Sequence, residues 1–129
     1  VYKWDASYIA QFFGAEIGGD QFRATAKYVG PLGEKFPANP LFAYERALVL
    51  IKEKKAKDAV AVLEPLVAKI DADPAIWGAP ARARVLWAAG RAACDSGDKA
   101  GAKKRAIACK AEKVKELDDR LDDLFDDLD

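Results

Sequence analysis

The stretch from Leu86 to Cys109, which reads LWAAGRAACDSGDKAGAKKRAIAC, constrains the fold of this chain more than any other part. It predicts two helices that fold back on each other around a tight turn at Gly97 and Asp98, because the alanine-rich flanks favour helix and the Gly-Asp pair interrupts it. Small residues stand where the two helices must approach closely, at Gly90, Ala93, Ala102 and Ala106. The sequence therefore predicts a closely packed helical hairpin.

Two segments upstream of this hairpin repeat each other at an offset of 34 residues. YVGPLGEKFPANP (28–40) superposes on VLEPLVAKIDADP (62–74) with five identities, which pair Pro31 with Pro65, Leu32 with Leu66, Lys35 with Lys69, Ala38 with Ala72 and Pro40 with Pro74. That period is typical of stacked two-helix repeats. The hairpin adds a third copy at an offset of 43 residues, in which Ala102 matches Ala59. About nine residues are then inserted between the second and third copies, in the region from Asp73 to Arg82.

Turn signals divide the rest of the chain into further helices. The segment Asp5–Ile17 has apolar residues three and four positions apart and is followed by a glycine pair, which predicts an amphipathic helix and its end. Asn39 followed by proline is a helix start signal, and this helix is expected to run to about Lys54. Another helix is expected from Asp58 to Ile70.

The composition favours helix and gives no indication of a compartment. The chain has 129 residues, which suits one domain. Its 26 alanines and single threonine favour helix over sheet. No apolar run approaches the roughly 18–20 residues of a membrane-spanning helix, so we expect no membrane span. A soluble protein of the cytoplasm or of the periplasm would fit equally well.

With these features the chain resembles tetratricopeptide repeat (TPR) proteins, with three repeats at about residues 5–38, 39–72 and 80–115. The family's small residue in the first helix matches Gly14, Ala47 and Gly90, and the alanine that opens its second helix matches Ala59 and Ala102. The chain departs from the family at the terminal proline of the repeat, which is present only in the first copy. The resemblance implies an all-α fold, a right-handed superhelical array of antiparallel helix hairpins that forms a single domain over residues 1–129.

The resemblance also implies a binding surface, because the first helix of each TPR repeat lines the concave face of the superhelix. Carried over to this chain, that face comprises Tyr8, Gln11, Tyr44, Leu48, Arg84, Trp87 and Arg91. Tyr, Trp and Arg are enriched in binding hot spots, although the aromatic residues can alternatively pack between repeats. Family members that clamp acidic chaperone tails use lysine, asparagine and arginine at positions that here are Gln11, Ala15, Glu45, Arg84 and Ala88. Binding of a chaperone tail is therefore not expected.

The C-terminal segment, residues 116–129, is acidic and amphipathic. It has eight acids and one base, a charge of −7 that leaves +7 on the rest of the chain. The spacing of its apolar residues is that of a heptad seam, made of Val114, Leu117, Leu121, Leu124 and Leu128. Because solenoid arrays need a terminal cap, we expect a C-terminal helix that covers the last repeat. The alternatives are a coiled-coil dimer contact and an acidic motif that a partner binds. No glycine or proline follows Gly101, which also allows the preceding helix to run straight into this segment.

The sequence lacks the residues on which most enzyme chemistry depends. It contains no histidine, the commonest general base and metal ligand. Cys94 and Cys109 lie at unequal distances from the turn at Gly97, about 10 Å apart along antiparallel helices, so we expect two separate thiols and neither a disulfide nor a zinc site. We expect no enzyme activity, no cofactor and no metal.

These observations predict a protein–protein interaction scaffold that captures a peptide or helix of a partner protein in the concave TPR groove. The alternative is a structural self-assembly module, a homo-oligomer formed through the C-terminal heptad helix or through exposed repeat ends. Nucleic-acid binding by the +7 body is not expected, because its lysines are spread over several helices.

Overall fold

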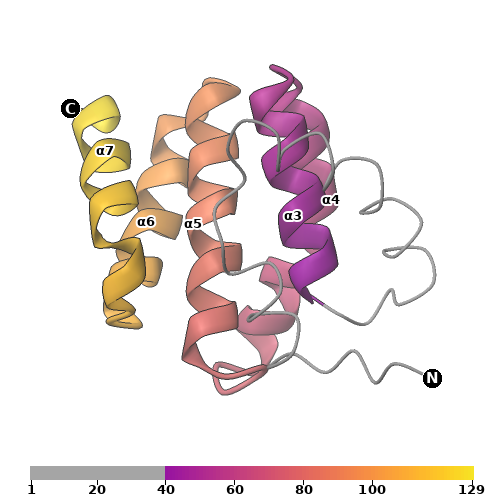
Figure 1. The fold of residues 1–129 in the computed structure, drawn as a ribbon, viewed down its shortest axis with the longest axis vertical. Helices are drawn as coiled ribbons and strands as arrows, with labels where there is room; N and C mark the ends of the chain where they lie inside the picture. The colour runs from indigo at the N-terminus through magenta and orange to yellow at the C-terminus, as the bar shows by residue number, and fades with distance from the viewer. Residues whose placement is uncertain (1–39) are drawn as a thin grey trace.

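The computed structural model describes residues 40–129, and these residues form helices with no strand among them. The elements in chain order are α3 (Pro40–Lys52), α4 (Ala56–Ala72), α5 (Ala79–Asp95), α6 (Lys99–Ala111), a short 3₁₀ helix η1 (Lys115–Leu117) and α7 (Asp118–Leu128) (Figure 1). The predicted all-α fold class is confirmed for this part of the chain. The predictions for the first copy, including Tyr8, Gln11 and the helix Asp5–Ile17, lie outside the described residues.

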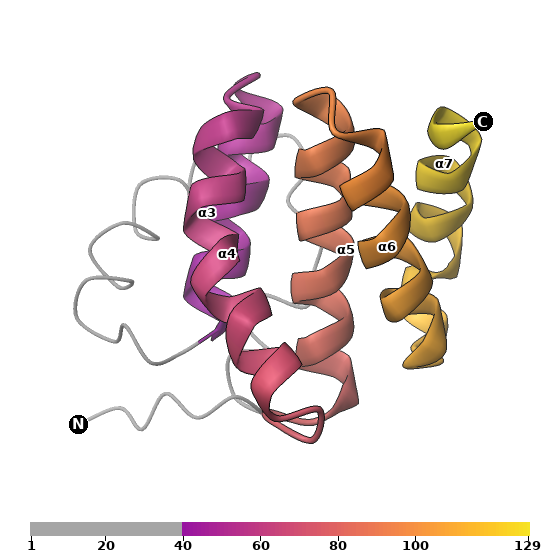
Figure 2. The same ribbon diagram turned by 180° about the vertical axis from the view of Figure 1, so that it is seen from behind.

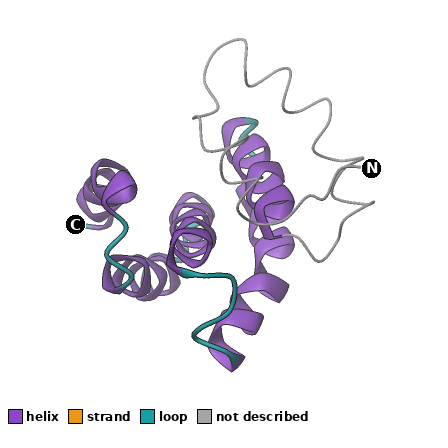
Figure 3. Cartoon of the chain, turned by 60° about the horizontal axis from the view of Figure 1, so that its bottom comes forward, coloured by secondary structure: helices purple, strands orange, loops and turns teal. Residues whose placement is uncertain are grey.

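The helices lie in two layers. α3, α5 and α7 face the viewer in Figure 1, whereas α4 and α6 face the viewer in Figure 2. α5 packs against α3, α4 and α6, and α7 packs against α5 and α6, so successive helices lie side by side in the end-on view of Figure 3. Leucine, valine, phenylalanine and alanine side chains fill the space between the layers; the largest fully buried apolar side chains are Phe42, Leu63, Val85, Leu117 and Leu124.

The α3–α4 and α5–α6 turns close in the same way. Lys54 and Gly97 both adopt a left-handed backbone, with φ of 65° and 97°. In each turn the next N–H donates to the carbonyl oxygen five residues earlier at 2.8 Å, which is the Schellman arrangement that satisfies the last carbonyls of a helix. The turn predicted at Gly97 is therefore present, and an equivalent turn joins the preceding pair of helices with lysine in place of glycine.

The two hairpins also agree in their helix ends and close contacts. Lys52 and Asp95 end α3 and α5, and Ala56 and Lys99 begin α4 and α6, with 43 residues between the members of each pair. The small residues at this same offset are all buried, namely Ala47, Gly90, Ala59 and Ala102. A Cβ atom on Gly90 would lie 3.3 Å from the Ala102 carbonyl oxygen. Residues without bulk therefore set the close approach of the helices within each hairpin.

Asp98 caps the N-terminus of α6. Its Oδ1 accepts a hydrogen bond from the Gly101 N–H at 2.9 Å, which satisfies one of the backbone donors left free at a helix start. A Cβ atom on Gly101 would overlap the Asp98 carboxylate, so any other residue at position 101 would force this side chain to shift.

We expect Asp98→Ala to lower the free energy of unfolding by about 1 kcal/mol, because the helix loses this side-chain acceptor. Urea denaturation followed by circular dichroism measures the change. Asp98→Asn is the matched control, since its amide oxygen keeps the acceptor. Equal losses for both variants would show that the cap contributes nothing beyond its charge.

The connection between α4 and α5 is shorter than the insertion expected over Asp73–Arg82. Only residues 73–78 form a loop, because Ala79 to Arg82 build the first turn of α5. Arg82 anchors this loop, since its Nη1 donates to the Ile76 carbonyl at 3.1 Å and its Nε lies 2.6 Å from a carboxylate oxygen of Glu112 at the end of α6. Trp77 is half-buried and packs against the core.

α6 and the C-terminal segment do not form one continuous helix. α6 ends at Ala111, Lys113 has a left-handed backbone with φ of 56°, and η1 leads into α7. The continuous helix that the sequence allowed is therefore absent. The reversal lets the leucine seam pack inside the chain, where Leu117, Leu121 and Leu124 are buried.

Both cysteines are free thiols, as expected. Cys109 is buried, whereas Cys94 is half-buried. Burial, helped by the charge of Glu112, raises the pKa of the Cys109 thiol to about 12. A thiol with this pKa is a weak nucleophile near neutral pH, because the thiolate is the reactive form.

No helix between Pro40 and Leu128 combines the length and the apolar character needed to cross a lipid bilayer.

Candidate partner-binding surface

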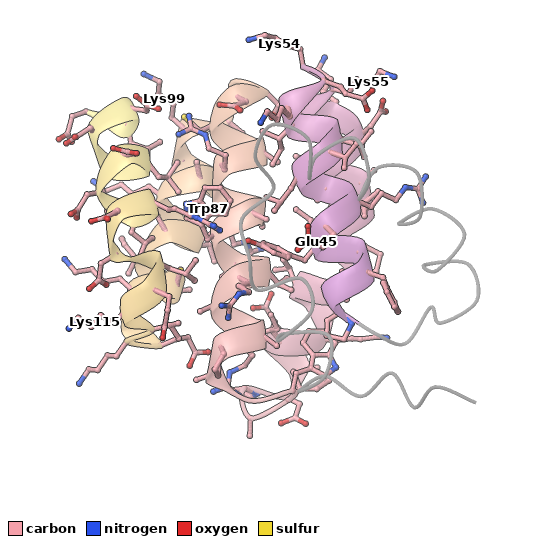
Figure 4. All side chains as sticks on the ribbon, in the orientation of Figure 1. Glu45, Lys54, Lys55, Trp87, Lys99 and Lys115 are labelled. Atoms are coloured by element: carbon pink, nitrogen blue, oxygen red, sulfur yellow. The ribbon has the colours of Figure 1, made fainter. Side chains whose placement is uncertain are left out.

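The described part of the predicted binding face lies on one layer of the molecule. Tyr44 and Leu48 belong to α3, and Arg84, Trp87 and Arg91 belong to α5. Figure 4 shows Glu45 of α3 and Trp87 of α5 on this side, where α3, α5 and α7 lie in a row. The structure thus gathers residues from two expected repeats on one face and adds α7 beside them.

Arg120 of α7 connects Tyr44 with Trp87. Its Nη1 donates a hydrogen bond to the Tyr44 hydroxyl at 2.8 Å, and its guanidinium carbon lies 5.4 Å from the centre of the Trp87 ring system. The indole N–H in turn donates to the Arg120 carbonyl at 3.1 Å. Tyr44 and Trp87 therefore help to hold α7 in place.

The prediction for this face did not include Arg120. The available signal was its position, since it is the only base among the eight acids of residues 116–129 and directly precedes the buried Leu121. Its partner Tyr44 is 3% exposed. Burial raises the pKa of Tyr44 to about 12, with a further contribution from the charge of Glu45, while Arg120 opposes the shift.

Glu45 is the least expected residue of this face. It is 1% exposed, and its Oε2 atom has no hydrogen-bond partner among residues 40–129. Burial raises the pKa of its carboxyl to about 8, against the opposing charges of Arg120 and Arg84. An unpaired buried polar atom is rare and costly. The sequence signal was an acid within an otherwise apolar helix face, which includes Phe42 and Tyr44.

The two arginines of α5 differ in their partners. Arg91 lies 2.8 Å from carboxylate oxygens of both Asp95 and Asp127. Burial alone would lower its pKa, but these two hydrogen-bonded carboxylates raise it. Arg84 is half-buried and donates at 3.1 Å to the Pro80 carbonyl of its own helix. Among residues 40–129 it has no carboxylate within ion-pair distance. Leu48, the remaining predicted residue, is half-buried and packs on the core.

These five residues, Tyr44, Glu45, Arg84, Trp87 and Arg120, are called the Glu45 cluster below. It joins α3, α5 and α7 and contains one buried carboxyl, two guanidinium groups and two aromatic rings. Such a set provides both hydrogen-bond donors and acceptors beside apolar surface. Within the described residues, no group of three or more cysteine, aspartate or glutamate side chains is arranged to hold a metal ion.

A hollow of about 360 Å³ lies on the opposite layer, between α4 and α6. Leu63, Val67, Ala89 and Ala93 contribute its apolar surface. Arg105 and Asp71, which also line it, form a 3.6 Å ion pair that joins α6 to α4. None of the predicted partner-binding residues that belong to α3 or α5 lines this hollow.

No protein-family model, curated protein or solved structure matches this chain.

Proposed function

We propose that this protein is a protein–protein interaction scaffold of the TPR type, which captures a peptide or helix of another protein on the face formed by α3, α5 and α7. Two features support the repeat architecture. The hairpins share their turn geometry, helix ends and buried small residues at the 43-residue offset. The helix that follows each hairpin also packs against both helices of that hairpin, as α5 does on α3 and α4 and α7 does on α5 and α6.

The proposed binding role rests on two polar groups of the Glu45 cluster, the Arg84 guanidinium and the Glu45 carboxyl. Within residues 40–129, Arg84 has no carboxylate partner, and the buried Oε2 atom of the neighbouring Glu45 has no hydrogen-bond donor. A polypeptide segment supplies a complementary group for Arg84, because its carbonyl or carboxylate oxygens accept hydrogen bonds from the guanidinium. The partner is therefore a segment with an acceptor at the position of Arg84.

Arg84 is a better test position than the other arginines or Trp87. Arg91, Trp87 and Arg120 all contact across the α5–α7 boundary, so their substitution alters the docking of α7 as well as any binding. Among residues 40–129, the hydrogen bond of the Arg84 side chain goes to a carbonyl of its own helix. Its substitution therefore changes the face without loosening α7.

We expect Arg84→Glu to weaken binding of a selected peptide by at least about tenfold, which corresponds to about 1.4 kcal/mol. The peptide is selected from a random display library against the immobilised full chain, and its affinity is measured by calorimetry. Arg46→Glu is the matched control, because Arg46 is exposed on α3 and the charge change is identical. Selection of no peptide, or equal affinity for wild type and Arg84→Glu, would refute the proposal.

A further inference from the structure

We propose that α7 exchanges between two copies of this chain, so that each copy places its α7 on the α5–α6 surface of the other. The partner is a second copy of the chain, and the interaction surface is the one that α7 covers within a single chain. This inference does not depend on the proposed capture of a foreign peptide.

At the centre of the surface that α7 covers, Leu124 fits into a space on α5. Leu124 is 0% exposed, and a Cβ atom on Gly90 would lie 3.0 Å from its Cδ2 atom. The absence of a side chain on α5 therefore makes the space that Leu124 occupies. Around it, Arg91 pairs with Asp127, and the Lys110 ammonium lies 5.7 Å from the centre of the Phe125 ring. All of these contacts join α7 to α5 or α6, so an α7 from a second copy would reproduce them unchanged.

The connection to α7 is short and strained. Only residues 112–114 separate α6 from η1, and Lys113 adopts a left-handed backbone. This conformation is unfavourable for a residue with a side chain. No glycine or proline lies between Gly101 and the end of the chain, so these residues can also continue α6 as a helix. Straightening the connection would remove the strain and separate α7 from its own α5.

The pattern of buried residues explains why a single chain needs the bend. The buried residues of α6 form a stripe that consists of Ala102, Ala106 and Cys109. If α6 continued as a helix, the next position of this stripe would be Lys113. The seam of α7 begins instead at Val114, one residue later, which is a rotation of about 100° around a helix. A continuous helix therefore cannot direct both stripes at its own core.

A continuous helix would align the α7 seam with a different residue of α6. Ile107 lies seven residues before Val114. Its side chain is 55% exposed, and among the side chains that the structure describes no other large apolar one is exposed to this extent. Together with Leu121 and Leu128 it would form one seam with heptad spacing. This seam would point away from the chain's own α5 and toward a second molecule. The exposed Ile107 thus has a use in the exchanged dimer that it lacks in the single chain.

Two substitutions of Lys113 change the connection in opposite directions. Lys113→Gly favours the bend, because glycine adopts the left-handed backbone without strain. Lys113→Ala favours the straight helix, because alanine is the strongest helix former. Lys113 is exposed, so neither change alters the core. Lys115→Ala, at an exposed position of η1, is the matched control.

Light scattering after size-exclusion chromatography measures the dimer fraction of the full chain refolded at high concentration. We expect Lys113→Ala to raise the dimer fraction several-fold above wild type, Lys113→Gly to reduce it several-fold, and Lys115→Ala to leave it unchanged. Persistence of a monomer in wild type and Lys113→Ala would overturn the proposal.

Isotope-filtered NMR of a dimer refolded from ¹³C-labelled and unlabelled chains separates exchange from simple side-by-side association. Exchange predicts interchain contacts between the Leu124 methyl groups and the Gly90 Hα atoms, which lie within one chain in the monomer. A dimer without these interchain contacts would refute the exchange of α7.

Discussion

Replacing Leu124 by alanine is expected to lower the free energy of unfolding by about 3 kcal/mol, a typical cost for emptying a fully buried leucine site. Leu124 is 0% exposed and its Cδ2 occupies the space above Gly90. Truncation leaves a cavity that the surrounding helix backbones cannot close, since Gly90 has no side chain to fill it. Urea denaturation followed by both circular dichroism and tryptophan emission measures the loss.

The matched control for this change is Leu128→Ala in the same helix. Leu128 is half-buried at the last position of α7, so its truncation is expected to cost about 1 kcal/mol or less. Equal effects of the two substitutions would show that α7 does not dock through Leu124. A large effect of Leu124→Ala alone would show that α7 contributes to the stability of the core, as a capping helix should.

Replacing Glu45 by glutamine is expected to stabilise the protein by about 1–3 kcal/mol near pH 8 and to change its stability little below about pH 5. Burial raises the pKa of Glu45 from 4.5 to about 8, so the folded state holds a proton that the unfolded state releases over this interval. The stability of the wild type should therefore fall as pH rises from about 4.5 to about 8. Glutamine stays neutral at every pH and avoids this loss.

The measurement is the difference in unfolding free energy between Glu45→Gln and wild type across this pH range, because the other titrating groups cancel in that difference. We expect the difference to grow up to about pH 8 and then to level off. Glu64→Gln, at an exposed site on α4, is the matched control and should show no such trend. A flat difference for Glu45→Gln would show that this carboxyl ionises normally in the folded protein.

The hairpin from Leu86 to Cys109 could be predicted because its signals are local. Gly97 permits the left-handed turn, Asp98 caps the next helix three residues before Gly101, and small residues at a fixed spacing allow close contact. The turn and the cap depend on residues within a few positions of one another, and the small residues face each other across one short turn. The other hairpin was predicted with less accurate ends, because its turn places lysine rather than glycine at position 54.

The hydrogen bonds within the Glu45 cluster could not be predicted, because they join segments that are far apart in the sequence. Arg120 reaches Tyr44, 76 positions earlier in the sequence, and its carbonyl accepts from Trp87, 33 positions earlier. Carrying family positions onto the chain selected Tyr44 and Trp87, which lie on α3 and α5. It gave no means of knowing that a side chain from the acidic segment would lie between them.

Within residues 40–129, the sequence alone determined the helices, the tight turn and the apolar seam, because helix propensity, capping and periodicity act over a few residues. Only the tertiary structure decided that the chain reverses at Lys113, that Leu124 fills the space above Gly90 and that the buried Oε2 atom of Glu45 has no hydrogen-bond partner among residues 40–129. The physical reason is that burial and desolvation are properties of a residue's surroundings in space. Those surroundings exist only after helices far apart in the sequence have packed together.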